Sequence, residues 1–185
     1  MDNLNTKISK TLKSLRKNRG WSLDAASKKT GVSKAMLGQI ERGESNPTIA
    51  ILWKIASGFD VSFSSFIDEV EQGHNIHRIV EFQQIHPKDD KINVMTIFPY
   101  DKELGLEIFI IELLPGCEHH SPAHQKGVIE HVVVARGEIE VLVSGIWHKV
   151  KENEGLKFNA DTLHGYRNLS NAKATFHDII HYPTT

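Results

Sequence analysis

The densest group of side chains that could do chemistry lies in residues 116–138, with the sequence GCEHHSPAHQKGVIEHVVVARGE. Its first sixteen residues hold four histidines and two glutamates, and the segment then continues as a plain apolar run. Imidazole and carboxylate groups can ligate zinc or iron, transfer protons in catalysis, or form a polar rim without chemistry. The segment therefore indicates a metal site, a catalytic site or a polar rim, and the elements around it must decide among these.

The histidine-rich segment belongs to a C-terminal part of the chain that has the pattern of a β protein. Turn residues such as Pro-Gly, Ser-Gly and Asn-Glu-Gly separate short apolar runs from residue 92 onward. Many closely spaced short strands predict an antiparallel sandwich or a small barrel. We expect strands at INVMTIF, LEIFIIELL, GVIEHVVVA, GEIEVLV, GIWHKV, GLKFN and ATFHDII.

Residues 4–67 have a different pattern, which predicts short helices. Leucine and isoleucine recur at helical spacing from Leu4 to Leu15, with lysines between them. Serine, asparagine and glycine mark the ends of the next elements. We expect a second helix from Ser22 to Gly31, a third capped by Ser33, a fourth opened by Asn46-Pro47 and ended by Gly58, and a short fifth at SFSSFI.

Charge divides the chain in the same way as the patterns do. Residues 1–58 carry eleven Lys and Arg against four Asp and Glu, whereas residues 59–185 carry eleven against nineteen. The formal charges of these parts, +7 and −8, return the net charge of −1. A basic part joined to an acidic part suggests that only the first meets a polyanion, although a solvated basic helix face would give the same count.

The second and third expected helices are joined by the tight turn TGVS, which is typical of a helix-turn-helix. With Leu37 and Ile40 pointing inward, we expect Lys34, Ala35, Gly38 and Gln39 to face out. Glutamine can pair with adenine, lysine with guanine, and an alanine methyl with the thymine methyl. Gly38 costs a helix about 1 kcal/mol relative to alanine, which indicates either a close approach to a backbone or base, or a tolerated flaw.

Residues 15–61, LRKNRGWSLDAASKKTGVSKAMLGQIERGESNPTIAILWKIASGFDV, resemble the Xre/Cro family of phage-repressor-like DNA-binding domains. The resemblance implies that Arg16 and Glu41 form an internal salt bridge. It also implies base contacts from the third helix, a phosphate contact at the start of the second, and Arg42 near the DNA backbone. The alternative is a helical domain kept for protein contacts. The candidate DNA-binding residues are Ser22, Ser33, Lys34, Ala35, Gln39 and Arg42.

Two spacings in the C-terminal part resemble the signature motifs of the cupin family, which are small antiparallel barrels. Glu130 is followed by six residues and then a glycine, and His164 by three residues and then an asparagine. The resemblance covers residues 92–182. It implies that the family's usual set of three histidines and one glutamate is reduced here to His124, Glu130 and His164, because Gln125 and Lys126 stand where the second histidine would be.

The reduced set still implies a divalent metal, zinc first and iron second, with open positions for a chelating effector. Lys126 would pair with an effector carboxylate, and Tyr166 would line the mouth of the pocket. A metal-free pocket, in which the two histidines form hydrogen bonds, is the alternative. His119 and His120 are expected in the loop before the strand, as an exposed rim, unless one of them supplies the missing ligand.

The whole chain resembles Xre-family regulators with a C-terminal cupin, in particular regulators of sulfur utilisation. The expected function is sequence-specific binding of double-stranded operator DNA, controlled by a small-molecule effector such as a sulfur-containing amino acid, in a homodimer without catalytic residues. A metal-dependent oxygenase of the phosphonate epoxidase type is the alternative. The basic recognition surface, and a His124-to-Glu130 spacing longer than that enzyme type prefers, argue against it.

The predicted organisation is a helix-turn-helix domain at 1–67, a linker at 68–91 with room for a first strand, and a cupin at 92–185. No apolar run approaches the roughly 18 residues that a membrane span needs. The N-terminal residues have no apolar signal-peptide core, and Cys117 is the only cysteine. These features predict a cytoplasmic protein that does not contact a membrane.

Overall fold

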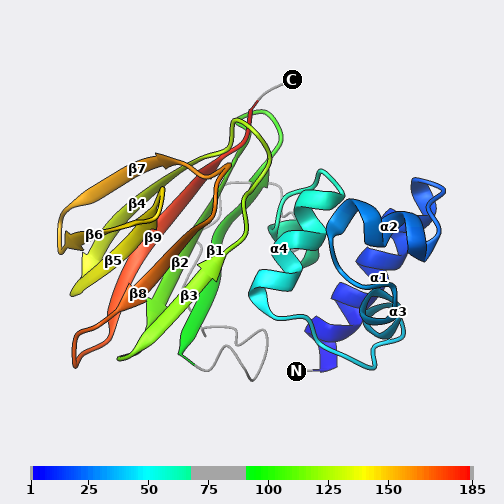
Figure 1. The fold of residues 1–185 in the computed structure, drawn as a ribbon, viewed down its shortest axis with the longest axis horizontal. Coiled ribbons are helices and arrows are strands. Elements are labelled where there is room, and N and C mark those ends of the chain that lie inside the picture. The colour runs from blue at the N-terminus through cyan, green and yellow to red at the C-terminus, as the bar shows by residue number, and fades with distance from the viewer. Residues whose placement is uncertain (1, 68–90, 184–185) are drawn as a thin grey trace.

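The computed structural model describes residues 2–67 and 91–183 (Figure 1). The predicted linker and the strand for which it had room lie outside these residues, apart from Lys91. Among the described residues, no helix is long and apolar enough to cross a membrane. The helices are α1 (Asp2–Asn18), α2 (Leu23–Thr30), α3 (Lys34–Glu41), α4 (Ile49–Gly58) and the short 3-10 helix η1 (Ser64–Phe66).

Serine and threonine side chains begin three of these helices. Ser22 and Ser33 cap α2 and α3 as predicted, each accepting a hydrogen bond from a backbone N–H in the first turn. The prediction that Asn46-Pro47 opens α4 is wrong. Thr48 is the cap, because its extended backbone lets its hydroxyl accept a hydrogen bond from Ile51 N at 3.3 Å. Proline therefore precedes the cap instead of following it.

The strands form two antiparallel sheets, in the orders β1-β2-β9-β4-β7 and β3-β8-β5-β6. This confirms the predicted fold class, an all-α helix-turn-helix part followed by an all-β cupin part. The strands are β1 (Ile92–Asp101), β2 (Leu106–Leu113), β3 (Cys117–Ser121), β4 (Ile129–Arg136), β5 (Glu138–Val143), β6 (Ile146–Lys151), β7 (Gly155–Asn159), β8 (His164–Asn168) and β9 (Ala174–His181).

Two strands, β3 and β8, were missed by the sequence analysis because their sequences, CEHHS and HGYRN, are mostly polar. The two pair with each other, with His119 opposite Tyr166. The strands lie so close that a Cβ on Gly165 would be 2.5 Å from the carbonyl oxygen of His119. His119 and His120 therefore lie on a strand, not in the predicted loop.

Helix α4 lies between the other helices and the strands (Figure 1). Next to it, the buried carboxylate of Glu107 on β2 accepts hydrogen bonds from the backbone N–H groups of Phe63 (3.2 Å) and Ser64 (3.0 Å) and from the Tyr182 hydroxyl. Burial raises the pKa of Glu107, although the hydrogen bonds oppose that rise. A side chain of the β part thus accepts the hydrogen bonds of the backbone N–H groups at the start of η1. This interaction joins the two parts of the protein.

Replacing Glu107 with alanine is expected to lower the free energy of unfolding by about 3 kcal/mol or more. The substitution leaves two buried backbone N–H groups and a tyrosine hydroxyl without an acceptor, and each such loss costs about 1–3 kcal/mol. Urea unfolding followed by circular dichroism would measure the change. Glu103→Ala, at an exposed position in the turn between β1 and β2, is the matched control, and equal small losses in both variants would contradict the expectation.

Candidate functional site

Three of the predicted site residues come together at one end of the β part. Glu130 lies on β4, His164 begins β8, and His124 lies in the loop between β3 and β4. Glu130 Oε1 is 2.8 Å from His124 Nε2 and 3.2 Å from His164 Nε2, and all three side chains are buried. One ligand atom from each residue lies within 4.8 Å of the others.

Neighbouring groups fix the orientation of the glutamate and of one histidine. The Tyr166 hydroxyl donates a hydrogen bond to Glu130 Oε2. His164 Nδ1 lies 2.9 Å from the carbonyl oxygen of Thr162, to which it donates, so that the proton of a neutral ring sits on Nδ1. In that neutral ring His164 Nε2 carries a lone pair and has no hydrogen bond in the described structure, whereas the protonated ring forms the 3.2 Å ion pair with Glu130. Outer-shell partners of this kind orient metal-binding histidines in general.

The electrostatics of the three residues favour a carboxylate beside positive charge. Burial alone would raise the pKa of Glu130, but the charge on His164 and the hydrogen bond from His124 hold it well below its usual range. Burial lowers the pKa of His164, yet the Glu130 carboxylate and the hydrogen bond to Thr162 outweigh burial, so the pKa is raised. Burial, with the nearby charges of Asp178 and Glu130, raises the pKa of Tyr166 well above its usual value.

The donor set fits a divalent metal of the zinc or iron class. Two imidazole nitrogens and one carboxylate oxygen are ligands that both metals accept, with positions left open. Ligand atoms bound tetrahedrally to one zinc lie about 3.3–3.5 Å apart, from bond lengths of about 2.0–2.2 Å. The two distances to Glu130, 2.8 and 3.2 Å, are slightly shorter, and all three ligand atoms lie within 4.8 Å of one another, so a modest rearrangement of the group would accommodate an ion. The buried Nε2 of His164, without a hydrogen bond, is the atom that such an ion would satisfy.

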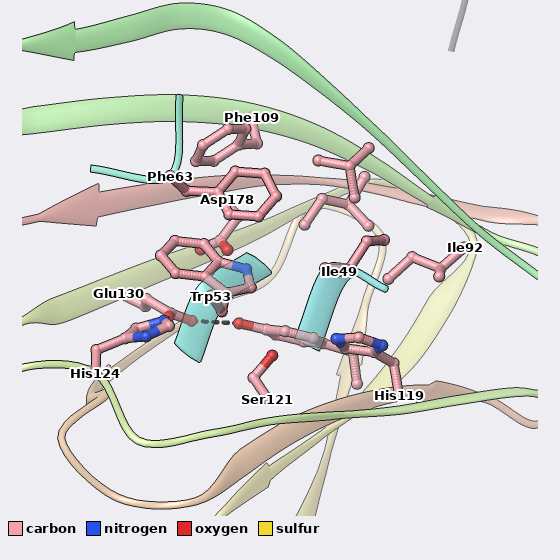
Figure 2. A pocket seen from close by; sticks show the side chains of 13 residues that line it. Ile49, Trp53, Phe63, Ile92, Phe109, His119, Ser121, His124, Glu130 and Asp178 are labelled. Carbon is pink, nitrogen blue, oxygen red and sulfur yellow. Dashed lines mark hydrogen bonds and ion pairs between the residues drawn. The ribbon is translucent and has the colours of Figure 1, made fainter. Parts of the chain in front are cut away.

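A cavity adjoins the cluster, and its volume is about 20 Å³. Its polar end is formed by the β part and its apolar end by both parts, with Trp53 and Ile49 reaching in from α4 (Figure 2). A cavity of about 10–15 Å³ on this measure holds one water, so the space suits an ion or one to two waters. The lining residues are Ile49, Trp53, Phe63, Ile92, Val94, Phe109, Ile111, His119, Ser121, His124, Glu130, Tyr166 and Asp178.

The cavity contains residues that sequence reasoning placed elsewhere or missed. His119 was expected on an exposed rim, but it lines the cavity, and burial lowers its pKa to about 4. Its place on β3 opposite Tyr166 is the reason, since paired residues share a face. Asp178, whose pKa burial raises well above its usual value, and Trp53 were not singled out. The alternation of Asp178 with Phe176 and Ile180 in the sequence could have indicated it, but nothing local indicates Trp53.

Lys126 is not brought to the cluster. It is exposed at the turn that precedes Val128 and is not among the lining residues. The reason is that His124 and Val128, on either side, are the buried positions of this loop, and both bond to Ala160: its carbonyl accepts from His124 N and its N–H donates to Val128 O. The side chain between them therefore faces solvent. Tyr166, the other predicted effector contact, does line the cavity.

The predicted DNA-binding residues form an exposed group on the helical part. The implied salt bridge is present, since Arg16 Nε and Nη2 lie 2.5 and 2.8 Å from the Glu41 carboxylate oxygens. It fixes α1 to the end of α3. All six predicted residues are exposed and therefore accessible to DNA: Ser22, Ser33, Lys34, Ala35, Gln39 and Arg42.

Gly38 was predicted to face outward on α3, and this is wrong. It is buried, and a Cβ added to it would lie 3.1 Å from Arg42 Nη1 and 3.7 Å from Leu23 Cδ1. The residue lies against the first turn of α2 and under the Arg42 side chain. Gly38 is therefore buried by the packing of α3 against α2 and the Arg42 side chain, and not by the approach of a base.

Comparisons with known proteins agree with this architecture. The helix-turn-helix family model matches residues 12–66 and the cupin-domain family model matches residues 109–180. The chain is 45% identical over 183 residues to the HTH-type transcriptional regulator SutR of Escherichia coli K12, covering 99% of both chains. A crystal structure of an HTH_3 family transcriptional regulator from Vibrio cholerae is 42% identical, covers 98% of both chains and superposes with a TM-score of 0.86.

A third relative matches the β part alone. The Cupin_2 domain of an XRE family transcriptional regulator from Enterobacter cloacae is 41% identical, with a TM-score of 0.50, and its alignment covers 51% of this chain and 99% of that domain. The whole-chain match at 45% identity decides the class. The chain belongs to the Xre-type helix-turn-helix transcriptional regulators with a C-terminal cupin domain.

Proposed function

We propose that this regulator is a cytoplasmic homodimer that binds a specific operator through α3 and responds to a small molecule held in the cupin part. The observation that carries the proposal is the pairing, in one chain, of a helix with exposed polar side chains (α3) and a cavity that has Glu130 and two histidines at one end and apolar side chains from α4 at its wall. Two copies are needed because one short recognition helix reads few bases. In a dimer the half-sites would lie about 34 Å apart, which is one turn of DNA.

The roles of the exposed residues follow from their chemistry. Gln39 would pair with adenine, Lys34 would contact guanine, and the Ala35 methyl would touch a thymine methyl. Ser22 and Ser33 lie at helix N-termini, where backbone N–H groups and the helix dipole favour phosphate. Arg42 would contact the DNA backbone. Lys34 is paired with Asp24 at 2.7 Å in the free protein, but an exposed pair contributes only about 0–1 kcal/mol and yields easily to a base contact.

In the cupin part, His124, Glu130 and His164 would hold zinc or iron. The metal would supply a Lewis acid to which a chelating effector binds through its amino, carboxylate or thiolate group. Tyr166 would hold Glu130 in its ligating orientation, and Thr162 would hold His164 with Nε2 available. The apolar end of the cavity would contact the body of the effector. An amino acid that contains sulfur is the first candidate, from the resemblance to regulators of sulfur utilisation.

The oxygenase alternative is less favoured because the relative that matches the whole chain is named as a transcriptional regulator. Metal analysis combined with an oxygen-consumption assay separates the two. Iron with turnover of an oxygen-consuming reaction would favour the enzyme, whereas metal without turnover favours the regulator.

Selection of operators from a random duplex library tests DNA binding directly. We expect the purified chain to enrich a palindrome with two half-sites, and native mass spectrometry to show two protomers on it together with any retained metal. The logarithm of affinity should fall with the logarithm of salt concentration, with a slope of about −0.9 for each phosphate contacted. Failure to enrich any sequence at low salt would contradict the proposal.

A further inference from the structure

Trp53 lies on the face of α4 that meets the strands. It packs against residues of the β part, and the fold of the helical part alone does not need these contacts. Its indole is only 8% exposed and lies between two rings from different parts of the protein. The ring centroid of Phe63 is 4.5 Å away in a stacked arrangement, and that of the candidate metal ligand His124 is 4.2 Å away. Phe109 of β2 lies edge-on at 6.5 Å.

The indole therefore forms a wall of the effector cavity that comes from outside the β part. Trp53 extends from α4 toward the polar end that holds His124 and Glu130, and Ile49 lies farther along the cavity, near Ile92 (Figure 2). With both in place the cavity measures about 20 Å³, enough for one or two waters. Even the smallest amino acid is several times larger than a water. The space beside Glu130 is thus smaller than an amino acid, and Trp53, next to His124, occupies the adjoining volume.

Movement of Trp53 would be transmitted to the DNA-binding surface. The C-terminal end of α4 lies against the end of α2, where a Cβ on Gly58 would be 2.6 Å from Thr30 Cα. Helix α2 in turn packs against α3, through Leu23 and Gly38. Because α4 packs closely against α2, and α2 against α3, we expect a displaced α4 to change the position of the recognition helix.

The other contacts across the junction are both apolar and polar. Phe63 packs edge-on against Phe109 with ring centroids 5.8 Å apart, and Glu107 accepts the hydrogen bonds from the backbone of η1 described above. Gln125, next to His124, donates a hydrogen bond to the exposed Asp60 at 2.5 Å, and Tyr100 N donates to Ser64 Oγ at 2.9 Å. The junction can therefore open only for a ligand whose binding compensates for the loss of these contacts.

We propose that Trp53 is a plug in the effector site, so that the effector and α4 compete for the same space and effector binding releases the DNA-binding part from the cupin part. The inference rests on the proposed function, because it takes the cavity to be the effector site. The inference adds Trp53, a residue of the DNA-binding part, to that site. It also specifies how effector binding changes the DNA-binding part, namely by displacing α4. The ligand it fits has a polar or chelating head for Glu130 and its histidines, and a short apolar body that replaces the indole.

The first test follows Trp53 directly in the full chain. Trp21→Phe and Trp147→Phe leave it as the single tryptophan, and the probes are the twenty amino acids, each with and without zinc. For every probe whose binding is detected by calorimetry, we expect the emission of Trp53 to shift to longer wavelength and acrylamide quenching to increase, at the same midpoint. Binding of a probe with unchanged emission and quenching overturns the plug and leaves the effector site intact.

The second test removes the plug. Trp53→Ala should bind the same probes about tenfold or more tightly, because a site that is open in only a minor population binds more weakly by that fraction. Operator affinity of this variant should no longer change when the probe is added, whereas that of the wild type should. Trp21→Ala, an equal truncation in the same part beside Phe59 and away from the cavity lining, is the matched control and should change neither quantity.

If Trp53 were only a core residue, Trp53→Ala would lower stability as Trp21→Ala does and leave probe affinity unchanged, which would overturn the inference. Should Trp53→Ala fail to fold, Gln125→Ala serves instead. It removes the hydrogen bond to Asp60 without opening the core, and should raise probe affinity about two- to tenfold, the equivalent of one hydrogen bond. Lys126→Ala is its exposed neighbour control. If no probe binds the wild type, Trp53→Ala or Gln125→Ala, the effector site itself fails, and the inference fails with it.

Discussion

Replacing His164 with alanine is expected to weaken zinc or iron binding by about 100-fold or more, because loss of even an outer-shell partner of a metal ligand costs about 10–100-fold. His164 provides one of the three ligand atoms that lie within 4.8 Å of one another. The fold should survive, since β8 keeps its pairing with β3 and β5. Metal content by mass spectrometry, and competition with a chromophoric chelator, would measure the loss.

His131→Ala is the matched control for this prediction. His131 follows Glu130 on β4, and successive residues of a strand face opposite sides. It is absent from the group of potential ligands in the described structure, so its removal should leave metal affinity unchanged. Tyr166→Phe should give an intermediate loss of about tenfold, because it removes only the hydroxyl that orients Glu130. Equal metal content in His164→Ala and the wild type would refute the metal assignment, and a loss of effector binding that persists without metal would favour a metal-free pocket.

Replacing Gln39 with alanine is expected to weaken binding to a selected operator by about 5- to 150-fold, the equivalent of the 1–3 kcal/mol that a bidentate base contact contributes. The side chain is exposed on α3, whereas Leu37 and Ile40 on either side of it in the sequence are buried and hold the helix in place. Binding to unrelated duplex should hardly change, because phosphate contacts supply nearly all non-specific affinity. Fluorescence anisotropy on both duplexes would separate the two effects.

Lys34→Ala should also weaken operator binding, and it should reduce the salt dependence if the ammonium lies near phosphates. Lys54→Ala removes the same charge from an exposed position of α4 and is the matched control for simple loss of positive charge. Operator affinity at the wild-type level in both Gln39→Ala and Lys34→Ala would show that α3 is not the recognition helix. Neither variant should change the cupin part, which metal content and thermal unfolding would verify.

Local features of the sequence were sufficient for much of the helical part and for the metal candidates. The helix ends at Ser22, Gly31 and Ser33 were predictable because a cap is formed by neighbouring residues within one turn. The fold class followed from two different hydrophobic patterns. His124, Glu130 and His164 followed from spacings that resemble a known family, and the structure brings them together.

The tertiary structure decided what depends on contacts between distant segments. The sequence could not place His119 in the cavity, because the pairing of β3 with β8 joins residues that are far apart and mostly polar. Nor could it show that Lys126 faces solvent or that Gly38 is buried, since each depends on what lies across from it.

Trp53 is the clearest case of this division. Its spacing with Leu52 and Ala56 is typical of an apolar helix face, and that face is buried. Which surface would bury it was not encoded in the spacing, because an apolar side chain gains the same hydrophobic free energy against any partner that excludes water. By itself the sequence determined that a DNA-binding part and a cupin are joined. Only the folded chain decided that α4 inserts its tryptophan against His124, because that contact requires the two parts to dock in one particular orientation.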